Sequence, residues 1–170
     1  GIFAMPATLA LLQCARVLPP EATFRLEVGP GIRAVGQPAD LAGSQQAQVL
    51  EYEVRPPFMA TITCTRERAG RPCLPITPIS LSFSAPVPRA AVAQVHLAAG
   101  DTRFEPEPQE DEDAVISQLS FPGPFPPNTA LTLSVPDDLQ DDAGRNLENA
   151  ERFPLKVEVA DYPPLAKFAS

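Results

Sequence analysis

Few side chains in this sequence are of a type that does chemistry, and they are widely spaced. His96 is the only histidine, and it stands in "QVHLAA", which predicts a strand position among small neighbours. A Ser-His-Asp triad needs its imidazole between a nucleophile and an acid. The chain also contains no G-x-S-x-G elbow, glycine-rich phosphate loop or H-E-x-x-H pair. We therefore predict no catalytic residue and no enzymatic activity.

An acidic segment between Arg103 and Ala114 is the next candidate for a site. The stretch "RFEPEPQEDEDA" holds six carboxylates and no glycine. A calcium loop arranges its carboxylates around a glycine bend, whereas a run of like charges repels itself and stays solvated. We predict a solvated loop, with cation binding and docking of a basic partner as the alternatives. The acidic residues are Glu105, Glu107, Glu110, Asp111, Glu112 and Asp113.

The stretch "DLQDDAGRNL" resembles a calcium loop faintly, with Asp141, Asp142 and Asn146 around Gly144. A related stretch earlier in the chain, "IRAVGQPA", keeps a glycine, Gly36, without the acidic residues. The feature that both share is turn chemistry, because glycine readily adopts a positive φ. We predict a structural turn here, and no metal or cofactor in the chain.

The three cysteines predict one disulfide and one free thiol. Cys64 and Cys73 bracket the polar segment "TRERAGRP", which reads as a loop that closes on itself. A disulfide across it would indicate an oxidising compartment; two unpaired cysteines in a cytosolic protein are the alternative. No CxxC pair or nearby histidine supports zinc. Cys14, in the apolar run "LALLQCARV", is predicted to be a buried free thiol, or else to pair with a residue further upstream.

An internal repeat with a spacing of 107 residues organises the chain. The same apolar alternation follows a double proline in both copies, and the two glycine turns come after it. Cys14 aligns with Phe121 at the same spacing. The aligned segments are Pro19-Pro20 with Pro126-Pro127, Phe24, Leu26 and Val28 with Leu131, Leu133 and Val135, Ile32 with Leu139, residues 50–52 with 157–159, and Pro56-Pro57 with Pro163-Pro164.

Strand patterns of period two recur along the chain, and helical periodicity is confined to a short turn in "PRAAVAQ". The 22 prolines also disfavour long helices. The sequence predicts an all-β, antiparallel, Ig-like or macroglobulin-like β-sandwich, although without the buried tryptophan of antibody domains. The expected strands cover residues 23–28, 48–54, 79–84, 130–135 and 153–159, with weaker patterns at 58–64 and 93–99.

The repeat length defines the predicted domains, because it is close to the ~100 residues of an immunoglobulin-like sandwich. Residues 1–57 would be the C-terminal half of a preceding module, residues 58–165 a complete module, and residues 166–170 the start of a linker. The chain would then be part of a longer protein. The alternative is that residues 1–57 form an appendage, although half a sandwich would expose an apolar face.

The charge of −8 disfavours nucleic acid and anionic membrane surfaces as partners. No run of about 18 apolar residues exists that would insert into a membrane. The first residues lack the basic start of a signal peptide, as expected if the natural N-terminus lies upstream.

Four ordered segments resemble the bacterial alpha-2-macroglobulin-like proteins and their Ig-like modules. Ser82, Phe83, Ser84, Pro86 and Val87 carry an "F-S-x-P-V" strand, and Asp141, Gly144 and Leu147 carry a "D-x-x-G-x-x-L" turn. The resemblance covers nearly the whole chain. The segments are "PFMATITC", "CLPITPISLSFSAPVPRA", "FPPNTALTLSVPDDLQDDAGRNL" and "FPLKVEVADYPPLAKF".

This resemblance implies a scaffold within a periplasmic protein that traps proteases. The expected partners are neighbouring macroglobulin modules and, through the full-length protein, target proteases. The C-x-E-Q thioester motif of some members is absent from this sequence. This interpretation also allows an inner-membrane anchor in a missing N-terminus. The alternative function is a tandem Ig-like adhesion or surface-display module that binds a glycan or a host protein.

Overall fold

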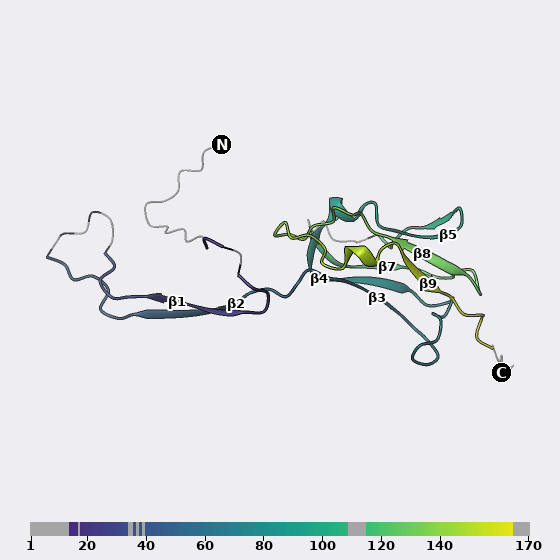
Figure 1. The fold of residues 1–170 in the computed structure, drawn as a ribbon, viewed down its shortest axis with the longest axis horizontal. Coiled ribbons are helices and arrows are strands. Elements are labelled where there is room, and N and C mark those ends of the chain that lie inside the picture. The colour runs from purple at the N-terminus through teal and green to yellow at the C-terminus, as the bar shows by residue number, and fades with distance from the viewer. Residues whose placement is uncertain are drawn as a thin grey trace, which may run out of the picture. The chain divides into compact units, whose positions relative to one another are not determined.

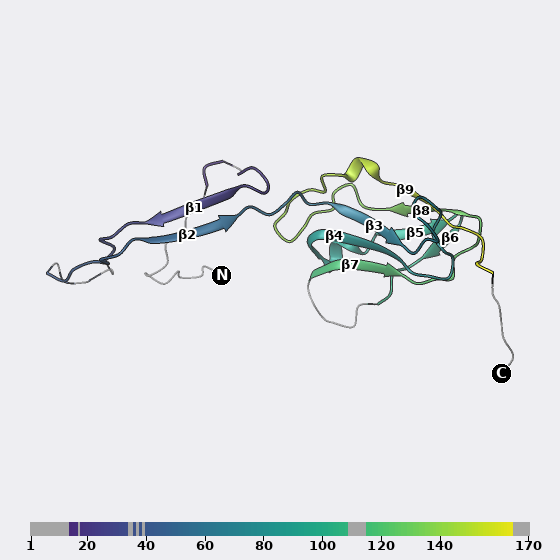
Figure 2. The ribbon, with the colours of Figure 1, turned by 90° about the horizontal axis from the view of Figure 1, so that it is seen from below.

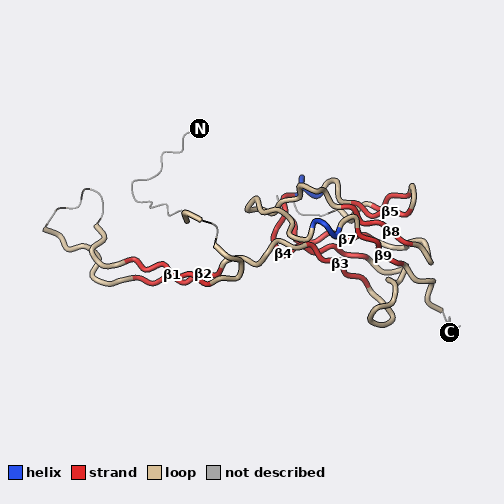
Figure 3. Tube along the Cα trace, viewed as in Figure 1, coloured by secondary structure: helices blue, strands red, loops and turns tan. Residues whose placement is uncertain are grey.

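The computed structural model describes residues 14–16, 18–33, 36, 38, 40–108 and 115–164. The chain divides into two compact units, Gly1–Pro56 (unit 1) and Pro57–Ser170 (unit 2). In the described ranges all extended elements are β-strands, and the helical ones are two short 3-10 turns (Figure 3). None of the helices there is long and apolar enough to cross a bilayer. The prediction of an all-β, antiparallel fold is confirmed.

The described part of unit 1 contains one antiparallel hairpin, formed by β1 (Thr23–Val28) and β2 (Gln48–Glu53) (Figure 1). Its strands have the predicted alternation, so that one face is mainly apolar and the other is mainly polar. The apolar side chains lie opposite one another in register, Phe24 with Tyr52 and Leu26 with Leu50. The rings of Phe24 and Tyr52 stack with their centroids 5.2 Å apart.

Unit 2 is a sandwich of two antiparallel sheets (Figure 2). A three-stranded sheet has the order β3-β4-β7, and a four-stranded sheet has the order β6-β5-β8-β9. The chain passes from one sheet to the other between β4 and β5, between β6 and β7, and between β7 and β8. The strands are β3 (Ala60–Cys64), β4 (Ile79–Pro88), β5 (His96–Ala99), β6 (Thr102–Phe104), β7 (Val115–Phe121), β8 (Ala130–Ser134) and β9 (Leu155–Glu158), and the 3-10 turns are η1 (Arg89–Val92) and η2 (Ala150–Arg152).

The core of unit 2 lies between these two sheets. Alternate residues along β4 point into it, from Ile79 through Phe83 to Val87. On the facing sheet, Leu131 and Leu133 of β8 are fully buried. Burial of such side chains stabilises the fold by about 1.5–3 kcal/mol each. The period-two pattern therefore has a direct physical cause, because each inward position of a strand contributes to one shared apolar layer.

The polar side chain of Asn149 stabilises the outer edge of β3. Asn149 is buried, and its side chain forms both hydrogen bonds of a strand neighbour with Ala60: Nδ2 donates to the Ala60 carbonyl at 2.8 Å, and Oδ1 accepts from the Ala60 N–H at 3.0 Å. Next to it, the Glu148 N–H donates to the Phe58 carbonyl at 2.8 Å. The backbone groups at the start of β3 are thus satisfied without another strand.

We expect Asn149→Ala to lower the free energy of unfolding of unit 2 by about 2–3 kcal/mol, because a buried backbone donor and acceptor would lose their partners. Chemical denaturation followed by circular dichroism measures this loss. Asn146→Ala is the matched control, since Asn146 is exposed and accepts a hydrogen bond from Gln140 at the surface. Equal losses in the two variants would contradict this role of Asn149.

The repeat seen in the sequence has counterparts in backbone geometry. Glu21 and Asn128, which follow the two double prolines at a spacing of 107, have φ values of 60° and 52° and are the only positive-φ residues other than glycine in the described chain. Gly36 and Gly144 have φ values of 82° and 75°, as predicted for the two turns. The interpretation of residues 1–57 as half of a module stays a prediction.

One detail of the predicted alignment is wrong. The alignment at 107 matches Tyr52 with Val159, but in the structure Tyr52 pairs with Phe24 as Val157 pairs with Leu131. The second strand of the repeat is therefore offset by two residues, because the paired residues Phe24 and Tyr52 are 28 positions apart in the sequence and Leu131 and Val157 are 26 apart. An offset of two leaves every side chain on the same face of its strand.

Candidate functional site

His96 lies at the start of β5 rather than in the middle of a strand. Its Nδ1 is 2.8 Å from the Gln94 carbonyl oxygen and 2.7 Å from Nη2 of Arg103. According to its tautomer, the imidazole donates to Gln94 or accepts from Arg103. Among the described residues, no hydrogen bond or ion pair joins the imidazole to a serine or a carboxylate, so His96 takes part only in hydrogen bonds at the surface.

The acidic segment is only partly within the described structure. Glu105 forms an ion pair with Arg103 (3.6 Å), and the Glu107 N–H donates to the Ser120 carbonyl at 2.7 Å. The ion pair is largely exposed, so it adds little stability. Glu110, Asp111, Glu112 and Asp113 lie outside the described residues, and the prediction of a solvated loop is untested for them.

Asp141 holds the turn between β8 and β9 in place. Its buried Oδ1 accepts from the N–H groups of Ala143 at 3.0 Å and Arg145 at 2.8 Å. Its Oδ2 accepts from Arg145 Nε at 2.7 Å, and Arg145 Nη2 is also 2.7 Å away. Gly144 has the positive φ that lets the chain return to these donors. The predicted structural turn is what the structure shows, with the carboxylate used to bind its own backbone.

The pKa of Asp141 is set by two opposing effects. Burial would raise it, but the hydrogen bonds from Arg145 and Ala143 and the guanidinium charge outweigh burial, so the pKa lies below its ordinary value. A lowered pKa in the folded state means that the ionised carboxylate stabilises the fold. This contribution is fully present above the ordinary aspartate pKa and is lost as the pH falls through the folded-state value.

We expect Asp141→Asn to lower the free energy of unfolding at pH 7 by about 1.5–3 kcal/mol, the range for hydrogen bonds to a charged group. The difference from the unchanged protein should begin to shrink as the pH falls below about 4, the ordinary aspartate pKa. It should reach its minimum below the lowered folded-state pKa of Asp141, where both folded proteins lack the charge. Urea denaturation at a series of pH values measures this. Asp138→Asn, the same change at an exposed position, is the control. A difference that does not depend on pH would contradict the charged role of Asp141.

Two motif residues of β4, Ser84 and Pro86, form hydrogen bonds with neighbouring segments. Ser84 Oγ donates to the Pro57 carbonyl at 2.8 Å and accepts from the Met59 N–H at 2.8 Å. The Pro86 carbonyl accepts from the Asp142 N–H at 2.8 Å. The "F-S-x-P-V" strand and the "D-x-x-G-x-x-L" turn are therefore in direct contact, and both motifs serve the fold.

The predicted disulfide between Cys64 and Cys73 is present. Cys64 ends β3, while Cys73 lies beside the end of β9: the Cys73 N–H donates to the Glu158 carbonyl, and the Cys73 carbonyl accepts from the Ala160 N–H, both at 2.8 Å. The bond thus links the edges of the two sheets. Cys14 is a free thiol as predicted, but it is exposed, not buried. Its aligned residue Phe121 is buried between the sheets of unit 2, and Cys14 has no such cover among the described residues.

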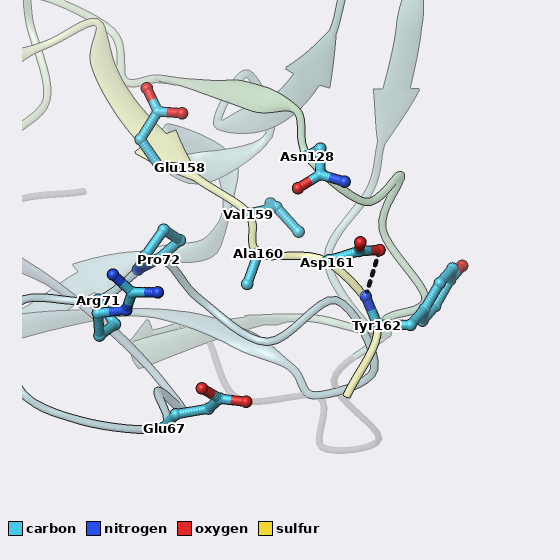
Figure 4. Close-up of a pocket in the computed structure, with 9 residues that line it drawn as sticks. All are labelled: Glu67, Arg71, Pro72, Asn128, Glu158, Val159, Ala160, Asp161 and Tyr162. Atoms are coloured by element: carbon cyan, nitrogen blue, oxygen red, sulfur yellow. Dashed lines mark hydrogen bonds between the residues drawn. The ribbon is translucent and has the colours of Figure 1, made fainter. Parts of the chain in front are cut away.

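An open depression of about 460 Å³ lies beside the disulfide loop (Figure 4). Its walls come from the loop and from the chain that follows β9. Tyr162 is half exposed, and its ring lies next to Asp161 at the end of the depression away from Arg71. The Tyr162 N–H donates to Asp161 Oδ1 at 2.8 Å. An aromatic face, an amide from Asn128 and carboxylates together could form hydrogen bonds and stacking contacts with a polar ligand.

A second depression, of about 370 Å³, is lined by residues of β3, β9 and the disulfide loop. Its charged lining is mainly basic, from Arg66, Arg71, Arg152 and Lys156, with Glu158 as the carboxylate. Arg66 Nε donates to Cys64 Sγ at 3.3 Å. Sequence reasoning did not identify either depression, because their residues come from segments far apart in the chain.

Within the described ranges, no three histidine, cysteine, aspartate or glutamate side chains are grouped as metal ligands. The buried polar side chains of the described residues, Asp141 and Asn149, form hydrogen bonds with backbone groups. The arrangement can therefore hold the sandwich together and offer two shallow polar surfaces. No protein-family profile, curated protein or solved structure matches the chain.

Proposed function

We propose that this chain is a non-catalytic scaffold of a longer, macroglobulin-like protein that traps proteases in the bacterial periplasm. The observation that carries the scaffold role is the use of its motif residues. Asp141 binds its own turn, and Ser84 and Pro86 bind neighbouring backbone. A segment whose characteristic polar residues all serve its fold supplies rigidity to the protein around it.

The strand order supports an Ig-like module. Three strands, β3-β4-β7, face four strands, β6-β5-β8-β9. With β3 as strand A, this order matches A-B-E against C′-C-F-G, in which the C′ strand joins the C-F-G sheet. Stacked modules of this kind hold distant parts of a protein apart and transmit a rearrangement through their interfaces.

The disulfide supports an oxidising compartment. Cys64 and Cys73 are linked, and such bonds persist in the periplasm and outside the cell but are rare in the cytosol. The periplasmic location and the protease-trapping role also rest on the sequence resemblance described above.

The trapping role is tested with a protease and an excess of the full-length protein, so that every protease molecule can be trapped. A small chromogenic substrate should still be cleaved, while a large protein substrate should be protected. The 170-residue chain alone should protect neither. The trapping proposal would be contradicted if cleavage of the two substrates were inhibited equally, or if both substrates were still cleaved.

A second candidate function, display of a ligand-binding surface, is favoured by the depression around Tyr162. Its exposed ring lies near Asn128 and Asp161, a combination that suits a carbohydrate. Glycan-array binding that Tyr162→Ala abolishes and Tyr52→Ala leaves intact would support this function over the scaffold role.

A further inference from the structure

The β1–β2 hairpin has an open apolar face, which consists of Phe24, Leu26, Val28, Leu50 and Tyr52. All five side chains point to the same side because of the period of two along each strand. The exposed fractions of Phe24, Leu50 and Tyr52 are 36%, 42% and 45%. A contiguous apolar face of this kind marks an interaction surface, and an isolated hairpin is at best marginally stable in water.

Unit 2 shows what covers the equivalent face. In β8 and β9, the equivalent pairs are Leu131 with Val157 and Leu133 with Leu155. Leu131 and Leu133 are fully buried and Val157 nearly so, in one core with residues of β3, β4 and β7. The equivalent of Ile32, which is 57% exposed, is Leu139, which is 1% exposed. The two hairpins therefore share the same pattern of apolar pairs but, among the described residues, only in unit 2 do other strands bury these side chains.

The two hairpins also share their closing hydrogen bonds. In unit 1, the Val54 N–H donates to the Ala22 carbonyl at 2.9 Å, and in unit 2 the Val159 N–H donates to the Thr129 carbonyl at 2.9 Å. Both bonds follow the positive-φ residue after the double proline. The likeness thus extends to the backbone, so the covered hairpin is a valid guide to the open one.

The outer edge of β1 is the second part of the surface. β8 pairs with β5 as well as with β9, and Leu97 lies opposite Leu133 in that ladder. In the described part of unit 1, β1 pairs with β2 alone. The positions equivalent to the β5-paired segment of β8 are residues 25–27, whose backbone groups can accept another strand.

We propose that the open face and the outer edge of β1 bind the first half of a β-sandwich module, supplied by the same polypeptide ahead of β1. This partner carries five antiparallel strands with the apolar alternation of β3 to β7. One of its strands extends the sheet at β1, and its second sheet packs on the open face. Chain order supports this source, because in unit 2 every covering strand precedes β8. The surface exists whether or not the full protein traps proteases.

The test adds such a half-module to the intact chain. A copy of residues 58–107, which contains β3 to β6, joined ahead of Gly1 preserves the spacing of 107, so that residues 8–14 of the chain take the sequence position of β7. The chain has no tryptophan and only two tyrosines, so in a Tyr162→Phe background the fluorescence comes from Tyr52. Acrylamide quenching of Tyr52 should fall by about threefold or more in the extended chain, because its ring becomes buried.

A matched control carries Leu81→Ser and Phe83→Ser within the copied segment, which removes the apolar face of that strand and keeps its length. Its Tyr52 quenching should equal that of the unextended chain. A smaller fall in the extended chain, or the same fall in the control, overturns the proposal. The proposal is also overturned if Tyr52 is already protected from quenching in the unextended chain because two copies associate. A molecular-mass measurement would detect such a dimer.

A second measurement does not depend on how the added segment folds. The unextended chain should enhance the fluorescence of a hydrophobic dye, and the double variant Phe24→Ser, Tyr52→Ser should lose most of this enhancement. Serine substitutions at Thr23 and Glu53, which pair on the opposite face, should leave it unchanged. Equal dye binding by all three proteins would show that the face is not open, which also overturns the proposal.

Discussion

Leu133→Ala should lower the free energy of unfolding of unit 2 by about 2–5 kcal/mol, the range for a buried leucine that leaves a cavity. Leu133 is fully buried in β8, between the two sheets. Thermal or urea denaturation followed by circular dichroism measures this loss. It is the largest effect that we expect from a single substitution described here.

The matched control for this prediction is the same substitution in the repeat. Leu26 is equivalent to Leu133, but it lies on the open face of β1. We expect Leu26→Ala to change the unfolding of unit 2 by less than about 0.5 kcal/mol, as for substitutions away from a core. Similar losses for Leu26 and Leu133 would contradict the distinction between an open and a covered hairpin.

Removal of the disulfide should lower the stability of unit 2 by about 3 kcal/mol. The bond closes a short loop, with a sequence separation of 9, and the chain-entropy estimate for so short a loop is slightly below the ~3 kcal/mol of a 15-residue one. Cys73 is also buried beside β9, so its loss disturbs packing. The measurement compares the double variant Cys64→Ser, Cys73→Ser with the unchanged protein by urea denaturation.

Cys14 has to be replaced in both proteins of this comparison, since it is an exposed free thiol that could exchange with the disulfide. In the Cys14→Ser background, a reductant should destabilise the protein with the disulfide and leave the double variant unaffected. A protein whose stability is the same with and without reductant would show that the bond does not hold the sheet edges together.

The sequence predicted most strands of unit 2, because their apolar residues face a single core. In β4, every second residue from Ile79 to Val87 is buried, and period two is the direct signature of such a strand. The strands β8 and β9 were found in the same way. The Ig-like character of the sandwich and the half-module in residues 1–57 remain proposals.

β7 was not predicted, and its sequence explains why. Its buried residues are Ile116, Leu119 and Phe121, so the alternation changes phase between Ile116 and Leu119. The cause lies in its partner, since the β4–β7 register shifts between Ser82 and Val87. A bulge of this kind breaks the pattern that sequence reasoning depends on. β6, with three residues, is too short to show any period.

The roles of single polar residues were harder to predict than strands. A turn was predicted around Gly144 from its residue types, but nothing in the sequence indicated that Asp141 binds Arg145, or that Asn149 binds Ala60 across a separation of 89 residues. Such contacts depend on the packed sheets. The predicted burial of Cys14 was wrong because it relied on the cover that Phe121 has in unit 2.

Amide hydrogen exchange, resolved by residue in the 170-residue chain, tests most directly the claim that the same β hairpin occurs once covered and once open. Core strands exchange only when the whole unit unfolds, whereas an uncovered hairpin opens locally. We expect the amides of β8 and β9 to be protected at least about a hundredfold more than those of β1 and β2. Equal protection at Leu26 and Leu133, and at Tyr52 and Val157, would contradict the account.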